Sequence, residues 1–296
     1  MVLSSRYRPF FLYNLTSLIS GQLLAERYVA KISETIAQLT DKPGLTMIMV
    51  GNNSASAVYV GNKQKLCARV GIASNIVHLP NNISAQELAG VIDGLNTAQN
   101  VHGILLQLPL PKHLNISDFL CLIDPKKDVD GLHPHNLGLL MSGQPNMVPC
   151  TPQGCLQMIQ SVMPDISGAN VVVLGRSVLV GKPMALLLCH HDTTVTLVHS
   201  KSRDIQKICQ AADIVVSAMG VPGLLNHTYF NKDAVVIDVG ITSVDGAIKG
   251  DVQYDDVFGH VRALSPVPGG VGPMTVMNLM LNTLKTFQNL TDTQTV

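Results

Sequence analysis

The sequence contains two successive blocks in which short apolar runs alternate with amphipathic segments, and this alternation constrains its fold more than any other feature. The first block predicts strands at 45–50, 74–79 and 103–108 among helices at 21–39, 56–70 and 84–95. The second predicts strands at 170–174, 194–198, 214–218 and 234–239, with helices at 182–189 and 205–211 between them. Strands that alternate with helices form parallel sheets with helical crossovers. We therefore predict an α/β fold with two domains.

Pro145, Pro149 and Pro152 separate the two blocks and indicate a linker. Thr151 followed by Pro152 is typical of an N-cap with proline at the first helical position, which predicts a bridging helix over 152–162. A last apolar helix is expected from 275 to about 288, and we expect it to return to the first domain. The predicted division is thus 1–148 with 274–296 as one domain, and 149–273 as a Rossmann-type domain.

Charge and cysteine usage exclude several classes of protein. Twenty basic residues balance twenty acidic ones, so the chain lacks the basic surface expected of a protein that binds nucleic acid or an anionic membrane. No apolar run approaches the roughly 20 residues of a membrane-spanning helix. The six cysteines form no Cys-x-x-Cys pair, which indicates reduced thiols, a cytoplasmic location and no metal site. An amino-terminal transit peptide stays open as an alternative.

The strand at 170–174 runs directly into Gly175, Arg176 and Ser177, and Gly181 opens the next helix. This order of strand, glycine loop and helix is typical of a site where a helix N-terminus receives a nucleotide phosphate. Five residues separate Gly175 from Gly181, so the spacing differs from the Gly-x-Gly-x-x-Gly fingerprint. A plain turn between strand and helix is the alternative.

The end of the following strand bears on the choice of nucleotide. Sites for NAD place an acidic residue there to bind the ribose 2′-hydroxyl. This chain has Ser200 and Lys201 instead, and Arg176 lies in the glycine loop. These groups offer charge-assisted hydrogen bonds to a 2′-phosphate, so the pattern favours NADP. The alternative is a solvated basic turn.

Near the carboxyl terminus, residues 266–275 contain three glycines bracketed by prolines. Such a loop is rigid and lets the backbone approach a ligand closely. A hinge between the domains would explain the same composition.

The predicted helix at 56–70 carries an unusual lysine. At 100° per residue, Lys63 shares an arc of about 100° with Tyr59, Leu66, Cys67 and Val70. Lys65 and Arg69 lie on the opposite side of this helix. Lys63 therefore either extends from the edge of the apolar stripe to solvent or points into a cleft. In a cleft its pKa would be lowered, and the neutral amine could act as a base or activate water.

Two further polar positions follow strands of the first block. Gln107 is the one amide in the apolar run 104–108 and lies at its carboxyl end, where open α/β sheets bind ligands. Asp128 and Asp130 precede Gly131, and their carboxylates could belong to a functional site or to an ordinary Asp-Gly turn.

Taken in order, these motifs resemble the methylenetetrahydrofolate dehydrogenase/cyclohydrolase family. The resemblance spans roughly residues 20–290. It is carried by Tyr59-x-x-x-Lys63, Leu106-Gln107-Leu108-Pro109, Lys127-Asp128-Val129-Asp130-Gly131, Pro149-Cys150-Thr151-Pro152, Gly175-Arg176-Ser177 and the run from Pro266 to Thr275. Several separate motifs in one order are more specific than any single glycine loop.

The resemblance implies a homodimer that binds folate in the cleft between its domains. Such an enzyme oxidises 5,10-methylenetetrahydrofolate to the 5,10-methenyl form with NADP, and hydrolyses that product to 10-formyltetrahydrofolate. By family position Lys63 is the central cyclohydrolase residue, Gln107 and Tyr59 assist it, and Asp130 holds the pterin. The remaining implied folate contacts are Leu106, Leu108, Pro268, Gly269, Gly270, Val271 and Gly272. The implied NADP contacts are Gly175, Arg176, Ser177, Ser200 and Ile241.

Two alternatives and two departures accompany this interpretation. A monofunctional NAD(P)-dependent methylenetetrahydrofolate dehydrogenase with little cyclohydrolase activity is one alternative, and a nucleotide-binding protein without catalysis is the other.

Ser20 stands where the family commonly has an acidic residue, and Leu139 stands where it usually has arginine. The missing arginine affects a local salt bridge or domain contact rather than the chemistry. The first dozen or so residues lie outside the resemblance.

Overall fold

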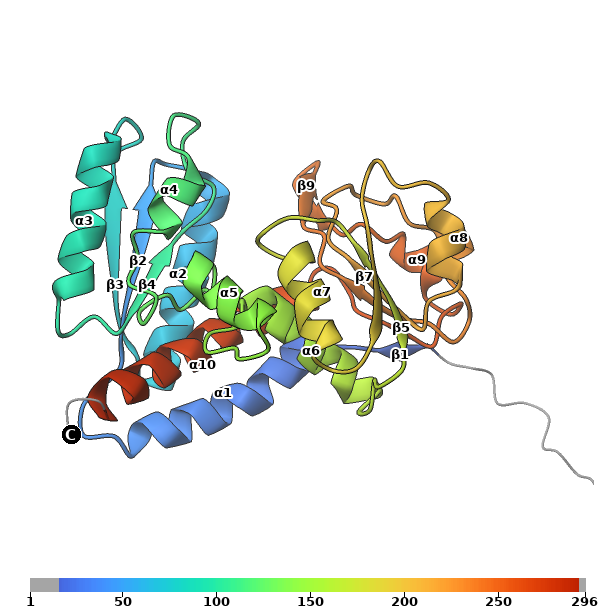
Figure 1. The fold of residues 1–296 in the computed structure, drawn as a ribbon, viewed down its shortest axis with the longest axis horizontal. Coiled ribbons are helices and arrows are strands. Elements are labelled where there is room, and N and C mark those ends of the chain that lie inside the picture. Colours follow the sequence, from blue (N-terminus) through green and yellow to red (C-terminus); the bar gives the residue numbers. More distant parts are fainter. Residues whose placement is uncertain (1–15, 293–296) are drawn as a thin grey trace, which may run out of the picture.

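The computed structural model describes residues 16–292 and contains two parallel sheets joined by long helices (Figure 1). The amino-terminal extension considered above and residues 293–296 of the predicted first domain lie outside the described residues. Both sheets confirm the α/β fold with helical crossovers. Among the described residues, no helix is both long enough and apolar enough to cross a bilayer.

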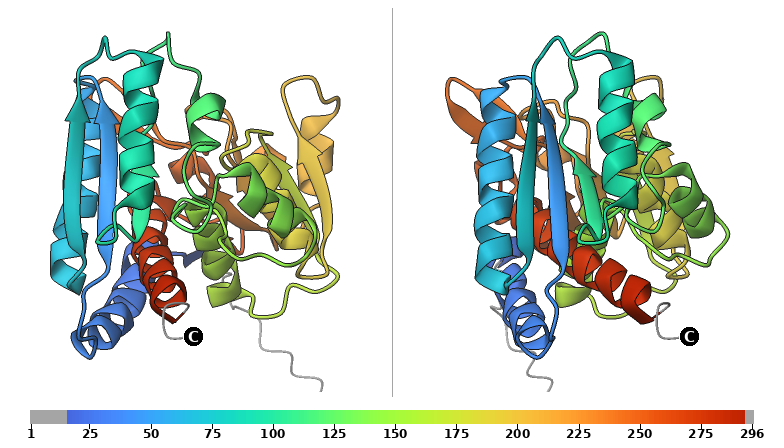
Figure 2. Two further views of the ribbon diagram at one scale, coloured as in Figure 1. Left: turned by 60° about the vertical axis from the view of Figure 1, so that its left-hand side comes forward. Right: turned by 90° about the vertical axis from the view of Figure 1, so that its left-hand side faces the viewer.

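The smaller sheet has three parallel strands, with β2 (Gly44–Val50) between β3 (Ala73–Leu79) and β4 (Gly103–Leu106). Every residue of β2 is buried, and its side chains alternate between two cores. Met47 faces α2 (Ser54–Val70), whereas Ile48 faces α3 (Ala85–Thr97). Figure 2 shows these helices on opposite faces of the sheet. The continuous apolar run is therefore a strand covered on both sides.

Helix α2 begins and ends where its sequence signals predict. The Asn53 side chain accepts a hydrogen bond from the Ser56 amide and caps the amino terminus. Gly71 ends the helix with φ at 89°, a left-handed conformation that favours glycine. The helix is thus held in place at both ends, which matters because it carries Tyr59 and Lys63.

The larger sheet has six parallel strands in the order β1-β11-β8-β7-β5-β6. Its strands are β1 (Ser17–Leu18), β5 (Asn170–Leu174), β6 (Thr194–Val198), β7 (Ile214–Ser217), β8 (Val235–Asp238) and β11 (Ala263–Leu264). The four strands predicted for this sheet, β5 to β8, are confirmed. The edge strand β1 and its neighbour β11 are two residues long each, which is too short for a periodic pattern. An antiparallel hairpin of β9 (Thr242–Val244) and β10 (Ala247–Lys249) was also not predicted.

The remaining helices connect these strands or cover them. They are α1 (Gly21–Ala37), α4 (Ile116–Leu120), α5 (Pro134–Met141), α7 (Gly181–Cys189), α8 (Ile205–Gln210), the 3₁₀ helix η1 (His227–Tyr229) and α9 (Tyr254–Val257). Ser20, the departure noted before Gly21, caps α1 by accepting a hydrogen bond from the Leu23 amide.

Helix α6 (Cys150–Val162) bridges the two sheets as expected, but the prediction of its cap was wrong. Pro149 occupies the N-cap position, and Thr151 lies inside the first turn. The Thr151 hydroxyl instead pairs with the Thr275 hydroxyl at 3.0 Å. A contact between distant segments, which no local pattern reveals, therefore determines the orientation of Thr151.

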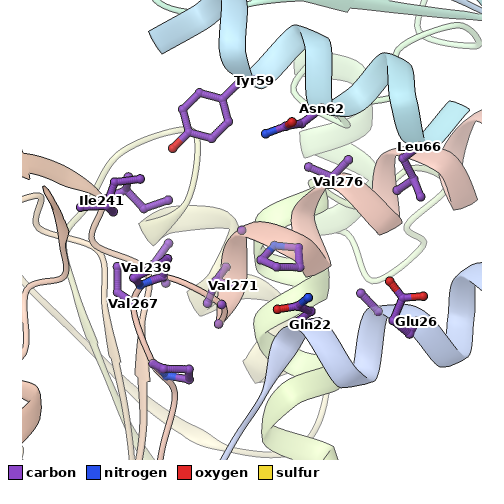
Figure 3. A pocket seen from close by; sticks show the side chains of 18 of the residues that line it. Gln22, Glu26, Tyr59, Asn62, Leu66, Val239, Ile241, Val267, Val271 and Val276 are labelled. Atoms are coloured by element: carbon purple, nitrogen blue, oxygen red, sulfur yellow. The ribbon is translucent and has the colours of Figure 1, made fainter. Parts of the chain in front are cut away.

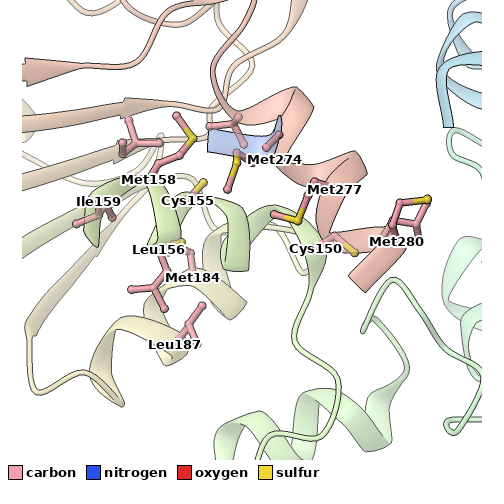
Figure 4. Close-up of a cluster of buried hydrophobic side chains, with 14 of the residues drawn as sticks. Cys150, Cys155, Leu156, Met158, Ile159, Met184, Leu187, Met274, Met277 and Met280 are labelled. Atoms are coloured by element: carbon pink, nitrogen blue, oxygen red, sulfur yellow. The ribbon is translucent and has the colours of Figure 1, made fainter. Parts of the chain in front are cut away.

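Helix α10 (Val271–Asp292) begins four residues earlier than predicted and includes part of the glycine-proline run. It packs against α6, α1 and α2 and also contacts β2 and β4 of the smaller sheet. At Gly154 of α6, an added Cβ would lie 2.9 Å from the Met274 Cβ, so glycine allows the two helices to approach closely. Figure 4 shows the methionine-rich core that α6, α7 and α10 form around this contact.

Candidate active site

Lys63 points from α2 toward the carboxyl edge of the smaller sheet. Its Nζ donates a hydrogen bond of 2.9 Å to Oε1 of Gln107, and the Lys63 side chain is half-buried. Burial lowers the pKa of the Lys63 ammonium, although the nearby Asp130 carboxylate opposes this effect. Of the two orientations considered for Lys63, extension to solvent does not occur, because the Lys63 side chain turns inward to Gln107 and Asp130.

Gln107 follows β4, which ends two residues earlier than predicted. Its backbone amide still donates to the Ile48 carbonyl at 2.9 Å, so the residue remains attached to the sheet. Its side-chain nitrogen donates to the Leu108 carbonyl at 2.7 Å. The amide group therefore uses its oxygen for Lys63 and its nitrogen for the backbone, which fixes its orientation. The Leu108–Pro109 peptide bond is cis.

The two aspartates of the Asp-Gly segment, Asp128 and Asp130, have different surroundings in the structure. Asp128 is buried and accepts hydrogen bonds from the Leu132 and His133 amides and from the Asn136 side chain, so it orders the following turn. Asp130 instead lies close to Lys63. Burial raises the pKa of the Asp130 carboxyl, and the positive charge of Lys63 opposes this effect. Lys63, Gln107 and Asp130 thus form one polar cluster.

Cys150 belongs to the same cluster and was not considered as a site residue. Its thiol is buried, and burial together with the adjacent Asp130 charge raises its pKa well above the ordinary value. The thiol donates to the Val129 carbonyl at 3.3 Å. At neutral pH the thiol is therefore protonated and unreactive. Its position directly after Pro149 in a recognised motif was the available signal.

Leu106 and Leu108 differ in their relation to the cluster. The Leu106 side chain is buried in the core beneath α3, so the structure does not bring it to Lys63. Leu108 is half-buried and contributes its carbonyl, which accepts from the Gln107 side chain and from the Ser56 hydroxyl.

A cavity of about 600 Å³ adjoins this cluster between the two sheets. Tyr59 and the carboxy-terminal loop line it, and the Tyr59 hydroxyl is directed toward Ile241 (Figure 3). The predicted site residues in its lining are Tyr59, Ile241, Pro268, Gly269, Gly270, Val271 and Gly272. Lys63, Gln107 and Asp130 are not part of this lining and lie at the neighbouring face of α2.

The carboxy-terminal loop is held against the start of α1. The Gln22 amide donates to the Gly269 carbonyl at 3.1 Å. A Cβ added at Gly21 would lie 1.8 Å from the Gly270 carbonyl oxygen, so only glycine fits there. Val271 and Gly272 belong to α10 rather than to a free loop. These contacts make the loop a rigid wall of the cavity.

The Gly175-Arg176-Ser177 loop lies at the carboxyl edge of the larger sheet, where β6 and β7 flank β5. Gly175 has φ at 112°, and an added Cβ would lie 2.3 Å from the Ala218 carbonyl oxygen. The Ser177 hydroxyl accepts hydrogen bonds from the Val180 and Gly181 amides and thereby starts α7. The first helical amides are thus already partnered, which differs from a helix N-terminus open to phosphate.

Arg176 and Ser200 are exposed near the same edge, after β5 and β6 respectively. Lys201 follows Ser200 and is also exposed, and no carboxylate occupies the end of β6. A guanidinium, a hydroxyl and an ammonium at a topological switch point fit a nucleotide that carries an additional phosphate. The donor set therefore suits NADP.

The described residues contain no group of three or more His, Cys, Asp or Glu side chains arranged to hold a metal ion. All six cysteines are free thiols.

Two parallel sheets, a glycine loop at a strand end and a cavity between the sheets define a two-domain protein that binds a nicotinamide dinucleotide. The model for the catalytic domain of tetrahydrofolate dehydrogenase/cyclohydrolase matches residues 19–130. The model for the NAD(P)-binding domain of the same family matches residues 149–291. The chain therefore belongs to the tetrahydrofolate dehydrogenase/cyclohydrolase family.

Individual relatives support this assignment. The bifunctional protein FolD of Wolbachia sp. subsp. Drosophila simulans is 46% identical over 276 residues, which covers 91% of this chain and 94% of the relative. The crystal structure of the bifunctional FolD dehydrogenase/cyclohydrolase from Campylobacter jejuni matches with a TM-score of 0.91 at 38% identity, covering 93% of this chain and 99% of that one. The Trypanosoma brucei FolD, solved with NADP and an inhibitor, matches with a TM-score of 0.89 at 38% identity, covering 93% and 98%.

Proposed function

We propose that this chain is a bifunctional enzyme that oxidises 5,10-methylenetetrahydrofolate with NADP and hydrolyses the resulting methenyl compound to 10-formyltetrahydrofolate. The observation that carries this proposal is the hydrogen bond from Lys63 to Gln107 beside Asp130. Relatives named bifunctional protein FolD, which are 46% and 43% identical to this chain over most of its length, support the proposal.

The hydrolytic step needs an uncharged base near a cationic substrate. The methenyl carbon is part of an amidinium cation, and water adds to it with loss of a proton. The new hydroxyl then loses its proton and becomes the formyl oxygen as the bond from that carbon to one ring nitrogen breaks, that nitrogen takes up a proton, and the formyl group remains on the other nitrogen. Because burial lowers the pKa of Lys63, a larger fraction of this amine is neutral than for an exposed lysine, and the neutral form can accept the proton of the attacking water. A neutral amine also avoids repelling the cationic substrate.

The residues around Lys63 orient its side chain or bind the substrate. Gln107 orients Lys63 through its side-chain oxygen. Asp130 binds the pterin ring, and Tyr59 packs beside the folate in the cavity. Leu108, Pro268, Gly269, Gly270, Val271 and Gly272 complete the folate contacts, and Leu106 supports them from the core.

The dehydrogenase step depends on orientation. NADP, when bound, supplies the chemistry of hydride acceptance. Gly175 and Ser177 would hold its pyrophosphate, Arg176 and Ser200 its 2′-phosphate, and Ile241 would lie beside the nicotinamide. The carboxy-terminal loop forms the wall between nucleotide and folate, and it excludes water from the space between them.

Several features of the whole protein belong to the same proposal. The catalytic domain comprises 1–148 completed by 274–296, and 149–273 forms the nucleotide domain. The packing of α10 on α1 and α2 supports this division, while the pairing of β1 with β11 ties the two domains together. The enzyme is a homodimer in the cytoplasm and supplies formyl groups for purine biosynthesis. Sedimentation equilibrium tests the dimer, and it would contradict the dimer by reporting the mass of one chain.

One coupled assay tests the proposed activities. Purified protein is given 5,10-methylenetetrahydrofolate with NADP, and NADPH formation and the absorbance of the methenyl compound are followed together. We expect NADPH to accumulate while the methenyl compound stays low because it is hydrolysed. Normal NADPH formation with a persistent methenyl compound would instead indicate the monofunctional dehydrogenase. Absence of turnover would contradict both activities.

A further inference from the structure

A second groove, of about 360 Å³, lies between α1 and α6 and is separate from the cavity between the sheets. Its lining consists of Leu24, Arg27, Tyr28 and Lys31 of α1 with Gln157, Gln160 and Ser161 of α6. The residues that α1 contributes to the cavity are Gln22, Ala25, Glu26 and Val29. At 100° per residue, the two sets lie roughly 160° apart around the helix. The groove therefore opens on the side of α1 that faces away from the cavity.

The groove forms because α1 and α6 both pack against α10. In Figure 1 these three helices lie together below the two sheets. Two helices that rest on a third leave a furrow between them. The lining residues of each helix are three or four positions apart, so they share one helix face and line the furrow from both sides.

Two cations in the groove have no anionic partner. Arg27 and Lys31 are four residues apart on one face of α1, and both are exposed. Within residues 16–292, neither forms an ion pair. Glu26 is paired with Arg69 on the other side of α1, and Glu34 lies outside the lining. The groove thus concentrates positive charge that no described carboxylate neutralises.

Gln157 adds hydrogen-bond donors because its side-chain oxygen is already used. Its Oε1 accepts a hydrogen bond of 2.9 Å from Nδ2 of Asn278, a buried residue of α10. The oxygen and nitrogen of an amide group point to opposite sides, so the two N–H groups of Gln157 are turned away from Asn278. No acceptor for these N–H groups is found in the described part of the chain. A ligand rich in acceptors therefore suits the groove.

The remaining lining provides contact area for an organic group. Tyr28 is half-buried and offers an aromatic face, and Leu24 lies one turn before it. The Ser161 hydroxyl donates to the Met158 carbonyl at 2.6 Å, so its proton is committed to α6. Sites for small molecules have volumes of roughly 300–1,000 Å³, and this groove lies at the lower end.

We propose that the groove between α1 and α6 binds a small phosphate monoester. Its phosphate lies between Arg27 and Lys31, and its organic part packs against Tyr28. A guanidinium, an ammonium and the Gln157 amide supply one group for each of the three terminal phosphate oxygens, and charge-assisted hydrogen bonds of this kind are the strong ones. A carboxylate has only two oxygens and one charge, so it fits this donor set less well. The groove is separate from the folate cavity, so its occupation does not depend on either proposed activity.

Isothermal titration calorimetry of the whole protein tests the site, with and without saturating NADP. The probes are ribose 5-phosphate, inorganic phosphate and ribose. We expect ribose 5-phosphate to bind with a Kd below about 1 mM, and NADP to leave this Kd unchanged. Inorganic phosphate should bind more weakly because it lacks the group that contacts Tyr28, and ribose should not bind.

Three results of this titration would overturn the proposal. The first is no binding of ribose 5-phosphate. The second is competition by NADP, because it would place the phosphate in the nucleotide site. The third is equal binding of inorganic phosphate and the ester, because it would show that the organic part makes no contact.

Substitutions locate the binding to the groove. Arg27→Gln and Lys31→Gln should each weaken the binding of ribose 5-phosphate by roughly three- to tenfold, because each removes one charged contact at an exposed site. Gln157→Glu keeps an oxygen for Asn278 but replaces the donating nitrogen by an anionic oxygen, so it should weaken binding by about tenfold or more.

Lys207→Gln is the matched control, because it removes the same charge from the exposed face of α8, outside the groove. Its Kd should equal that of the unaltered protein. Normal NADP binding by each variant verifies that it is folded. An unchanged Kd for ribose 5-phosphate in all three groove variants would refute the proposed site.

Discussion

Lys63 Nζ lies 2.9 Å from Oε1 of Gln107, and this contact joins a helix and a strand end that are 44 residues apart in the sequence. The Gln107 amide is fixed by its second hydrogen bond, to the Leu108 carbonyl. The position of the lysine nitrogen is therefore set by the sheet as well as by the helix. This relationship underlies the first two predictions.

Replacing Lys63 by methionine should remove hydrolysis and leave hydride transfer. Methionine keeps the apolar stem but has no nitrogen to accept the proton of water. We expect the rate of methenyl hydrolysis to fall by about 10² or more, the usual contribution of general acid-base catalysis. Methenyl decay and NADPH formation measure the two steps separately. Lys207→Met provides the control on an exposed helix position. Full hydrolysis by Lys63→Met would disprove the assigned role.

The pH dependence of hydrolysis should shift to lower pH in Asp130→Asn. The active form requires neutral Lys63, so the rate rises with pH through the Lys63 pKa, which burial places below its ordinary value of 10.5. The Asp130 carboxylate favours the ammonium and thus raises that pKa. Removing its charge lowers the Lys63 pKa, so the rising limb moves to lower pH. A shift to higher pH, measured from the pH profile of kcat, would contradict this assignment.

The nucleotide preference should depend on Arg176. Removing the guanidinium in Arg176→Ala loses a charge-assisted contact to the 2′-phosphate, worth roughly 1.5–3 kcal/mol. We expect kcat/KM for NADP to fall by roughly 10- to 100-fold, while the value for NAD, which lacks this phosphate, changes little. The ratio of the two values is the measurement. Equal losses for both nucleotides would show that Arg176 holds the loop rather than the phosphate. The exposed Arg203 offers a matched control as Arg203→Ala.

Gly154→Ala should destabilise the protein through the contact between α6 and α10. The added methyl group would lie 2.9 Å from the Met274 Cβ, and overpacking of this kind costs about 1–3 kcal/mol of unfolding free energy. Gly90→Ala is the control, because its added Cβ meets nothing within 4 Å in the exposed part of α3. That change should stabilise by about 0.5–1 kcal/mol, since alanine favours helix. Urea denaturation measures both, and a stable Gly154→Ala would show that the helices can separate without cost.

Sequence patterns predicted the regular elements well where the signal is local. The central strands of both sheets and the helices α1, α2 and α3 were expected within a few residues, because apolar periodicity and capping act over neighbouring positions. The strands β1 and β11 and the β9–β10 hairpin were missed. Each of these strands is two or three residues long, and β1 and β11 form only by pairing with strands distant in the sequence.

Within the site, the sequence singled out Lys63, Gln107 and Asp130, because a lysine on an apolar face, an amide in an apolar run and a carboxylate before glycine are each unusual. Local spacing did not distinguish Asp130 from Asp128, since both carboxylates occupy the same short turn, and only the family resemblance selected Asp130. The sequence also assigned Lys65 and Arg69 to the face opposite Lys63 without showing that both line the cavity beside α1. The ion pair between Arg69 and Glu26 joins residues 43 positions apart.

The sequence by itself therefore determined the two α/β domains, the glycine loop and the identity of the reactive groups, since these depend on side-chain chemistry and short-range periodicity. The tertiary structure alone decided which groups meet. It placed Asp130 beside Lys63, used Asp128 to order a turn and enclosed the cavity between α1 and α2. The physical reason is that these contacts arise from burial between segments distant in the chain, where packing and desolvation outweigh local preference.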